Sequence, residues 1–588
     1  MGFLKRIFRY IDIGRRLILN LVFIIFIFFI AASFFFPFQE YKKPFNKTLT
    51  FLPSQISETT NNEIFLFNAD SYELNLFEVI STLQIASSDK NIENIFIDLS
   101  NFSASYTGIL EIGEAFETVK ENGKRIIIYS DFYDSKKYLL ASYGDEILLN
   151  DNGILFTEGF KIEKIFLKNL LNKLKIDVTT YIAGSYKSAL ETFTRDSFSE
   201  NDKYQNSIFI NDIWSNWIKI IEKNRNSYLK VPFKDFMERF GDYSIEYKGD
   251  ISKMVKDLGL IDKTLSRTEL YDYISKIDDN QNKRLATRDS FINYSKNIKE
   301  NSSLNKIAVL TASGEIIDGE YNEGSISSNN FSRVLTNIGE DNSIKALFLR
   351  INSPGGSGFA SEVIRQQLND LGKKIPVLIS FSDISASGGY WIAMNQNKII
   401  ASPFTLTGSI GVWAVIPNFE EAFNSIGIAF DQISTSSLNL SILEPPSDNL
   451  SKFMQSYVEG SYTKFIDLVS KERGLKINET KSLAEGRIWS GNQALRNRLI
   501  DEISSYQNGI DYLIKKANLK DYKIELISTS PGIVDEIASF INSFISSSFY
   551  GLKSLPFIKS DSKKNKQLDT KLLCIECLFI SRNNQLFK

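Results

Sequence analysis

The chain has 588 residues, of which 43% are hydrophobic and 23% are charged, and its formal net charge is −2. This length exceeds what one hydrophobic core usually organises, so two or more domains are expected. The near-neutral charge gives no basis for nucleic-acid binding. The sequence contains no histidine, which excludes every serine hydrolase that relies on a histidine base.

The first element expected along the chain is a membrane anchor at residues 17–38, LILNLVFIIFIFFIAASFFFPF. An uncharged run of about 20 residues is long enough to cross a bilayer as a helix. The preceding residues 1–16 form a basic tail, so the positive-inside rule keeps the N-terminus in the cytoplasm. A cleaved signal peptide is the alternative, because residues 31–33 are small. The apolar run continues through residues 34–36, which favours an uncleaved anchor.

The remainder of the chain has the pattern of a duplicated domain. The stretch IENIFIDLSNFSAS from Ile92 resembles IKALFLRINSPGGS from Ile344, and the same offset of 252 residues still relates Gly159 to Gly411. A constant offset of this kind indicates an internal repeat. We expect one copy at 47–300, a second copy at 301–530, and a tail at 531–588 that contains an amphipathic helix.

Each copy alternates short apolar strands with amphipathic helices. In the second copy, KALFLRI, PVLISF and KIIAS are expected to be strands, and ASEVIRQQLNDLG is expected to be a helix ending at Gly372. Such alternation is typical of an α/β fold with parallel strands. The stretches SIFINDIWSNWIKIIEKN and SYTKFIDLVSKERG predict one long helix in each copy.

Two glycine motifs of the second copy are candidates for a site. In NSPGGSG (352–358), Gly355 and Gly356 predict a tight turn whose backbone N–H groups face an oxyanion or phosphate, although a plain strand-to-helix turn has the same composition. In SASGGYW (385–391), Ser387 precedes two further glycines and can equally be a helix cap.

A third motif, TLTGSIGVW (405–413), contains a candidate nucleophile, Ser409. It departs from the G-x-S-x-G elbow of α/β-hydrolases because Thr407 stands where the first glycine belongs. With no histidine in the chain, that family is excluded, and another base must take the serine proton.

Lys187, in GSYKSALETFTRDSFS (184–199), is the candidate base. The 252-residue offset pairs Lys187 with Asn439 and Ser409 with Thr157. The first copy therefore keeps the lysine and lacks the serine, and the second copy has the reverse. This complementarity predicts one composite site between the copies. The pKa of a free lysine is about 10.4, and burial can lower it by several units, which would allow the amine to act as a base.

The motifs RINSPGGSG, SASGGYWIA, TLTGSIGV and SYKSALE resemble those of the signal peptide peptidase A (protease IV) family, in its long form, within peptidase family S49. The resemblance implies a fold like that of Clp protease and crotonase, built from ββα units. It implies that Ser409 is the nucleophile and Lys187 the general base, and that Ser387 orients the lysine. It also implies an oxyanion hole formed by the Gly355 amide with that of Gly356.

The same resemblance implies a homotetramer with apolar grooves whose substrates are remnant signal peptides. The protein would be a single-pass protein of the bacterial inner membrane with its catalytic body in the periplasm. No cofactor, metal ion or nucleic acid is expected.

Three other functions are compatible with parts of the sequence. A crotonase-like acyl-CoA enzyme would share the glycine cradle, and a catalytically silent membrane scaffold would share the fold and the anchor. The S-x-x-K matches at 303–306 and 461–464, with SDN at 447–449, resemble a penicillin-binding enzyme, but no K-T-G follows. Cys574 and Cys577 could form a disulfide, half a metal site or neither, and the chain has no other cysteine or histidine to complete a zinc site.

Overall fold

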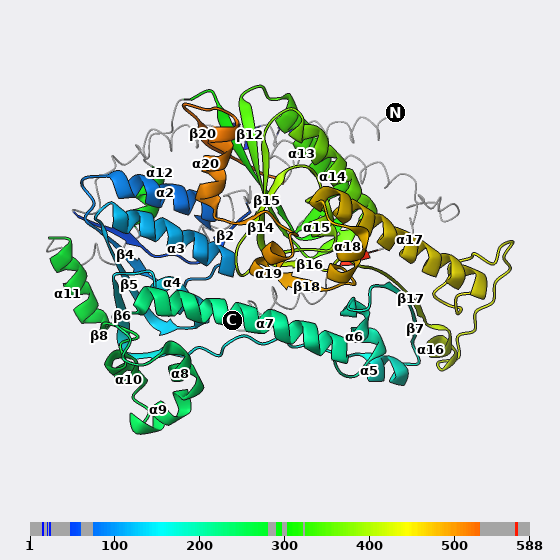
Figure 1. Cartoon of the computed structure of the whole chain (residues 1–588), viewed down its shortest axis with the longest axis horizontal. Coiled ribbons are helices and arrows are strands. Elements are labelled where there is room, and N and C mark those ends of the chain that lie inside the picture. Colours follow the sequence, from blue (N-terminus) through cyan, green and yellow to red (C-terminus); the bar gives the residue numbers. More distant parts are fainter. Residues whose placement is uncertain are drawn as a thin grey trace, which may run out of the picture. The chain divides into compact units, whose positions relative to one another are not determined.

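The computed structural model (Figure 1) describes residues 14–16, 20–21, 23–24, 47–59, 74–279, 290–296, 303–320, 324–529 and 571–573. The chain separates into a short unit, Met1–Asn46, and a large unit, Lys47–Lys588. The described residues of the short unit are helical. Across the described ranges, no helix combines the length and the apolar character needed to span a bilayer. Most of the predicted anchor, the tail helix and both cysteines lie outside these ranges.

The first copy is built on a five-stranded sheet in which the strands pair in parallel. Its order is β1 (Thr48–Phe51), β4 (Asn94–Asp98), β5 (Arg125–Tyr133), β6 (Glu146–Leu155) and β8 (Lys263–Leu265). The strand centres are rows of buried isoleucine, leucine and aromatic side chains. Helices α2 (Leu76–Ser88), α3 (Tyr106–Glu121) and α4 (Ser135–Ala141) connect the strands. The expected α/β class is confirmed.

The second copy contains a larger sheet of eight strands. Its main path runs β18 (Ile488–Ser490), β16 (Leu406–Gly408), β14 (Val377–Ala386), β12 (Ile344–Ser353), β9 (Lys306–Ser313) and β20 (Lys523–Ile527). Strand β15 (Lys398–Ala401) pairs with β14 and with β19 (Glu502–Ile503). Among the described strands of this sheet, only β18 runs antiparallel to its neighbour. Helix α14 (Gly358–Gly372) ends at Gly372, as predicted.

The duplication is visible in the order and position of the elements. A shift of 252 residues takes the first residue of α2 to that of α13 (Ser328–Glu340), α3 to α14, β5 to β14 and β6 to β15. The two long helices predicted from the sequence are α7 (Glu200–Arg225) and α17 (Asp448–Arg473). The copies therefore share one connectivity, and their functional differences must lie in side chains and in segments outside this common core.

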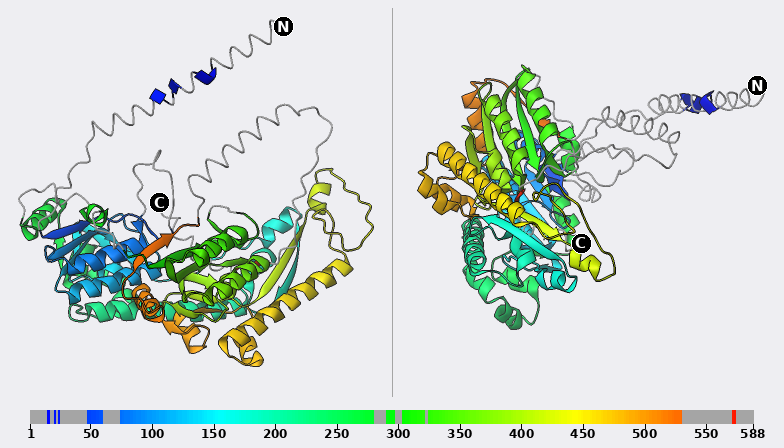
Figure 2. Two further views of the ribbon diagram at one scale, coloured as in Figure 1. Left: turned by 90° about the horizontal axis from the view of Figure 1, so that it is seen from above. Right: turned by 90° about the vertical axis from the view of Figure 1, so that its right-hand side faces the viewer.

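A two-stranded ladder joins the copies at one end of the body. Strand β7 (Asp177–Ala183) of the first copy pairs antiparallel with β17 (Val412–Asn418) of the second over seven residue pairs, as the cyan and yellow-green strands in Figure 2 show. Helix α7 then runs beneath β18 toward α4 (Figure 1). The ladder ends at the pair Ala183–Val412, so the residues that follow β7 lie beside the residues that precede β17.

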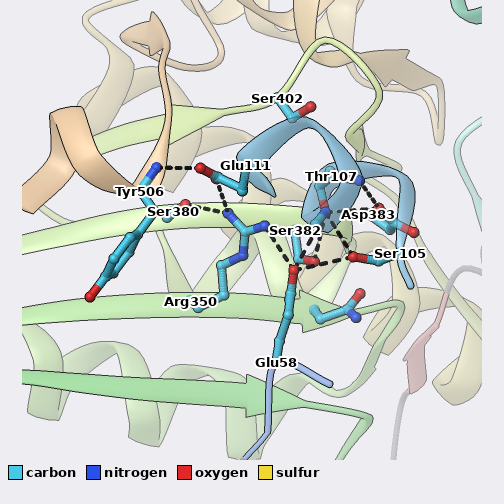
Figure 3. A network of polar contacts seen from close by, with 12 residues as sticks. Glu58, Ser105, Thr107, Glu111, Arg350, Ser380, Ser382, Asp383, Ser402 and Tyr506 are labelled. Atoms are coloured by element: carbon cyan, nitrogen blue, oxygen red, sulfur yellow. Dashed lines mark hydrogen bonds and ion pairs between the residues drawn. The ribbon is translucent and has the colours of Figure 1, made fainter. Parts of the chain in front are cut away.

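A buried polar network joins the copies at a second place (Figure 3). Arg350, on β12, donates to Glu58 (2.8 Å) and to Glu111 on α3 (3.4 Å), and all three side chains are buried. Asp383, on β14, accepts the backbone N–H and the hydroxyl of Thr107, each at 2.8 Å. A carboxylate at the first turn of a helix satisfies N–H groups that have no partner within the helix. The second copy thus supplies a carboxylate that accepts hydrogen bonds from N–H groups at the start of helix α3.

The two carboxyls paired with Arg350 respond differently to burial. Burial raises the pKa of Glu111 to about 7, although the charge of Arg350 and the N–H of Tyr506 act against the rise. Burial also acts to raise the pKa of Glu58, but the charge and hydrogen bond of Arg350 outweigh it, so the pKa lies below its ordinary value. Arg350 therefore forms its stronger ion pair with Glu58.

The NSPGG segment differs from its prediction. Gly355–Ser357 do not form a tight turn but a short strand, β13, which pairs with β10 (Glu315–Ile317). A Cβ on Gly356 would come within 2.0 Å of the Ile316 carbonyl oxygen, so only glycine permits this approach. On its other side β13 pairs antiparallel with β21 (Lys571–Leu573), and β21 also pairs antiparallel with β17. One extended segment therefore lies between β13 and β17.

Candidate active site

Lys187 and two serines meet where the copies join. Lys187 Nζ lies 2.9 Å from Ser409 Oγ and 3.0 Å from Ser387 Oγ. It also lies 2.9 Å from the Ser409 carbonyl oxygen. The lysine and the nucleophile candidate are 222 residues apart in sequence and come from different copies. Lys187 is 4% exposed, Ser409 is 1% exposed and Ser387 is fully buried.

The backbones of both serines are held in unusual conformations. Ser387 has φ 55° and Ser409 has φ 51°, in the region that L-residues other than glycine rarely occupy. Such a conformation persists only where the surroundings impose it, and it is common at functional sites. Ser409 follows Gly408 (φ 82°) and donates its N–H to the Arg487 carbonyl oxygen at 2.6 Å. These constraints point the Ser409 hydroxyl at the lysine.

Ser387 is the N-cap residue of the short helix α15 (Gly388–Ile392), but its side chain makes no capping hydrogen bond. The hydroxyl instead contacts Lys187 Nζ. The helix-cap alternative for Ser387 therefore accounts for its position in the chain and not for its side-chain contact.

The glycines of β13 lie against the residue that follows Ser387. A Cβ on Gly388 would come within 3.2 Å of the Gly356 nitrogen and 3.3 Å of the Gly355 Cα. The N–H of Gly355 donates to Ser353 Oγ at 3.2 Å. The structure thus places both predicted oxyanion-hole residues beside Gly388, on a short strand that leads directly into α14.

The turn that carries Lys187 is held from inside its own copy by a buried aspartate. Asp202, on α7, accepts a hydrogen bond from Ser188 Oγ (2.7 Å) and pairs with Lys164 (3.1 Å). Lys164 Nζ also donates to the Ser188 carbonyl oxygen at 2.7 Å. Burying a charge is costly unless it is paired and hydrogen-bonded, and Asp202 meets both conditions. The lysine turn is therefore rigidly attached to α7.

The sequence predicted neither the Asp202 contacts nor the turn Ala484–Arg487, which contacts both the lysine turn and the serine. A Cβ on Gly486 would come within 2.5 Å of the Lys187 nitrogen. The stretch AEGR at 484–487 contains a glycine, which is a turn signal. Nothing in that signal indicates which distant segments the turn would contact.

Comparison with known proteins gives the class of this protein. The Peptidase family S49 profile matches residues 118–280 and 369–520, one region in each copy. The chain therefore belongs to peptidase family S49 and is a serine protease. The expected duplication of the S49 domain is confirmed by these two regions.

The similarity extends over most of the chain. The chain is 32% identical over 491 residues to "Protease 4" of Haemophilus influenzae, and the match covers 81% of this chain and 78% of the relative. It is 31% identical over 558 residues to "Protease 4" of Salmonella typhi, covering 91% and 89%. Among solved structures, it is similar to a mutant of the "1510-N membrane-bound stomatin-specific protease" in complex with a substrate peptide, at 20% identity and a TM-score of 0.23, covering 41% of this chain and 98% of that one.

Proposed function

We propose that Ser409 and Lys187 form the catalytic dyad of this protease. Lys187 Nζ takes the proton of Ser409 as Oγ attacks the substrate carbonyl carbon. The resulting tetrahedral oxyanion collapses, the C–N bond breaks, and the lysine returns the proton to the leaving amine. Water then attacks the acyl-serine ester, with Lys187 again as base, and the carboxylate product leaves. The observation that carries the proposal is the buried 2.9 Å contact between Nζ and Oγ.

In the proposed mechanism Lys187 begins as a neutral amine, which has two N–H donors and one lone pair. The Ser409 carbonyl oxygen and Ser387 Oγ accept the two N–H groups, at 2.9 and 3.0 Å. The lone pair then faces the Ser409 hydroxyl. After proton transfer, an ammonium can donate to all three oxygens without moving. In this proposal Ser387 orients the lysine and stabilises both of its protonation states.

Gly355 and Gly356 are proposed to stabilise the oxyanion through their backbone N–H groups, and the Gly355 N–H then exchanges Ser353 Oγ for the oxyanion. Oxyanion stabilisation requires donors fixed before the reaction begins. The close contact of Gly356 with the Ile316 carbonyl oxygen and the approach of Gly388 both hold β13 in place.

The position of β21 supports an extended peptide as the substrate. This segment makes backbone pairs with Gly355, Gly356 and Ser357 on one side and with Trp413 on the other. A peptide that adds as a strand gains main-chain hydrogen bonds regardless of its sequence. We propose that substrate takes the place of β21 and so presents a peptide bond between the glycine strand and Ser409.

The finer function that we propose is the degradation of signal peptides left in the membrane, by a homotetramer anchored at the N-terminus with its body in the periplasm. The basic tail before the apolar run supports the anchor and its orientation. The relatives named "Protease 4" support the activity. Exposed apolar side chains on the segment after β17 support contact between subunits of the tetramer: Ile426, Ile428, Phe430, Ile433 and Leu438.

The test of the proposed function uses the full chain in detergent and a fluorogenic apolar peptide. We expect cleavage by the parent protein and none by folded Ser409→Ala or Lys187→Ala. A synthetic signal peptide in vesicles should be cut in preference to a polar peptide of equal length. Activity retained by both variants would refute the dyad, and a folded parent that cuts no peptide would favour the silent scaffold. Retention on a coenzyme A matrix would favour the acyl-CoA alternative.

A further inference from the structure

The turn Ala484–Arg487 contacts both partners of the proposed dyad. On the lysine side, the Glu485 carbonyl oxygen accepts the N–H of Tyr186 at 2.7 Å, and Glu485 Oε2 accepts the N–H of Ser185 at 2.9 Å. Both donors immediately precede Lys187. The guanidinium of Arg487 lies over the Tyr186 ring, 3.7 Å from its centre, which adds a cation–π contact.

On the serine side, the same turn bonds to the residues around the nucleophile. The Gly486 N–H donates to the Ile410 carbonyl oxygen at 2.8 Å, and the Ser409 N–H donates to the Arg487 carbonyl oxygen at 2.6 Å. The turn Ala484–Arg487 thus hydrogen-bonds both to the residues before Lys187 and to the residues around Ser409, which are far apart in sequence. Immediately after the turn, β18 pairs antiparallel with β16, the strand that ends at Gly408.

The Glu485 side chain is itself fixed in place. Its second oxygen, Oε1, accepts the hydroxyl of Tyr462 on α17 at 2.9 Å, and the same hydroxyl accepts the Glu485 N–H at 3.2 Å. Burial, together with the hydrogen bond to Glu485, raises the pKa of Tyr462, so this tyrosine remains a donor. Glu485 has φ 58°, which is unfavourable for glutamate. The two carboxylate oxygens of Glu485 thus accept hydrogen bonds from different segments, one from Ser185 and one from Tyr462.

We infer that Glu485 is a positioning residue, which sets the distance between the Lys187 amine and the Ser409 hydroxyl through the turn Ala484–Arg487. The inference rests on the proposed dyad. Glu485 touches neither reacting atom: its side chain links the Ser185 N–H to Tyr462 on α17, and its main chain links Tyr186 to the turn that bonds to Ser409 and Ile410. Because a displacement of about 1 Å can cost about 100-fold in rate, this role predicts a loss in kcat rather than in substrate binding.

The test compares Glu485→Ala, Glu485→Gln and a matched control, Glu269→Ala, in the full chain. Glu269 also accepts a backbone N–H, from Ser266 at 2.8 Å, but it caps α11 (Arg267–Ile277) in the first copy. Alanine and glutamine both keep a Cβ at φ 58°, so the backbone strain is similar in the two variants, and glutamine keeps side-chain hydrogen bonds that alanine cannot make. We expect Glu485→Ala to lower kcat about 10- to 100-fold with KM within about twofold. Glutamine should restore most of the rate, and Glu269→Ala should leave kcat unchanged.

A second readout separates positioning from stability. The rate at which a sulfonyl fluoride modifies Ser409 should fall with kcat in Glu485→Ala, measured well below its melting temperature. If kcat and modification rate match the parent while Ser409→Ala is inactive, the dyad stands and the inference is wrong. If alanine and glutamine lower kcat equally, the inference is also wrong. An active Ser409→Ala would refute the proposed function instead. Should Glu485→Ala not fold, Tyr462→Phe decides: kcat reduced about threefold or more supports positioning, and unchanged kcat overturns it.

Discussion

The two copies differ most at the equivalent positions of the serine and the lysine. In the second copy, Ser409 faces Lys187 at 2.9 Å. At the equivalent position of the first copy, Thr157 donates its hydroxyl to the sulfur of Met237 at 2.7 Å. The equivalent of Lys187 in the second copy, Asn439, lies in an exposed loop. Each copy thus contains one half of the proposed dyad and lacks the other half.

Aromatic side chains fill the first copy where the second is polar. Trp217 is fully buried and donates its indole N–H to the carbonyl oxygen of Ser135, the equivalent of Ser387. Trp214 stacks on Trp217, and both contact Phe160 edge-on. The comparison shows how a duplication can yield one site from two: one copy becomes a packed support, and it supplies the lysine through β7.

The largest effects are expected when the two residues of the proposed dyad are altered separately. Ser409→Ala and Lys187→Ala should each lower kcat/KM about 10⁴-fold or more, because neither member of a dyad works alone. The double variant should be no worse than either single variant. Thr157→Ala, at the equivalent position of the first copy, should keep full activity. Peptide hydrolysis under identical conditions measures all four, and a large loss in Thr157→Ala would refute the asymmetry.

The next largest effect concerns the network that joins the copies. Arg350→Met leaves Glu58 and Glu111 buried without their cation, and breaking a buried pair in this way costs about 3–5 kcal/mol of unfolding free energy. Lys373→Met is the control, because it and its partner Asp370 are 69% and 66% exposed and the loss should stay below about 1 kcal/mol. Urea denaturation followed by tryptophan fluorescence compares the two. Equal losses would mean that the joint is no more important than a surface pair.

A smaller effect tests the protonation of the same network. The folded pKa of Glu111 is about 7, against an ordinary value of 4.5, so the folded state holds the proton more tightly. The stabilisation is therefore complete below pH 4.5 and is lost as the pH rises through 7. Glu111→Gln, which cannot ionise, should lack this loss, which is at most roughly 3 kcal/mol. Denaturation of both proteins from about pH 5 to about pH 8 measures it, and parallel curves would contradict the prediction.

Much of the fold follows from local sequence, because the strand and helix patterns repeat at a constant offset. The pairing of Lys187 with Ser409 was also predictable, since each is missing from the opposite copy. The strand character of Gly355 and Gly356 was not, because it depends on the approach of Ile316 from β10. The Arg350 network and the contacts of the Glu485 turn were likewise not predictable from the sequence. The carboxylate partners of Arg350 and the Ser185 partner of Glu485 lie more than 200 residues away in sequence, and no periodicity relates such positions.

The smallest predicted effect concerns β21, which has no equivalent among the described strands of the first copy's sheet. It lies between β13 and β17, where we propose that substrate binds, so the two should compete. Leu572→Pro removes a backbone N–H from the centre of β21 and disfavours its pairing. Apparent affinity scales with the fraction of sites that are vacant, so KM should fall about threefold or more while kcat is unchanged. Leu572→Ala keeps the N–H and should match the parent. If both variants show the parent KM, substrate does not compete with β21, and the peptide must approach Ser409 along another edge of the glycine strand.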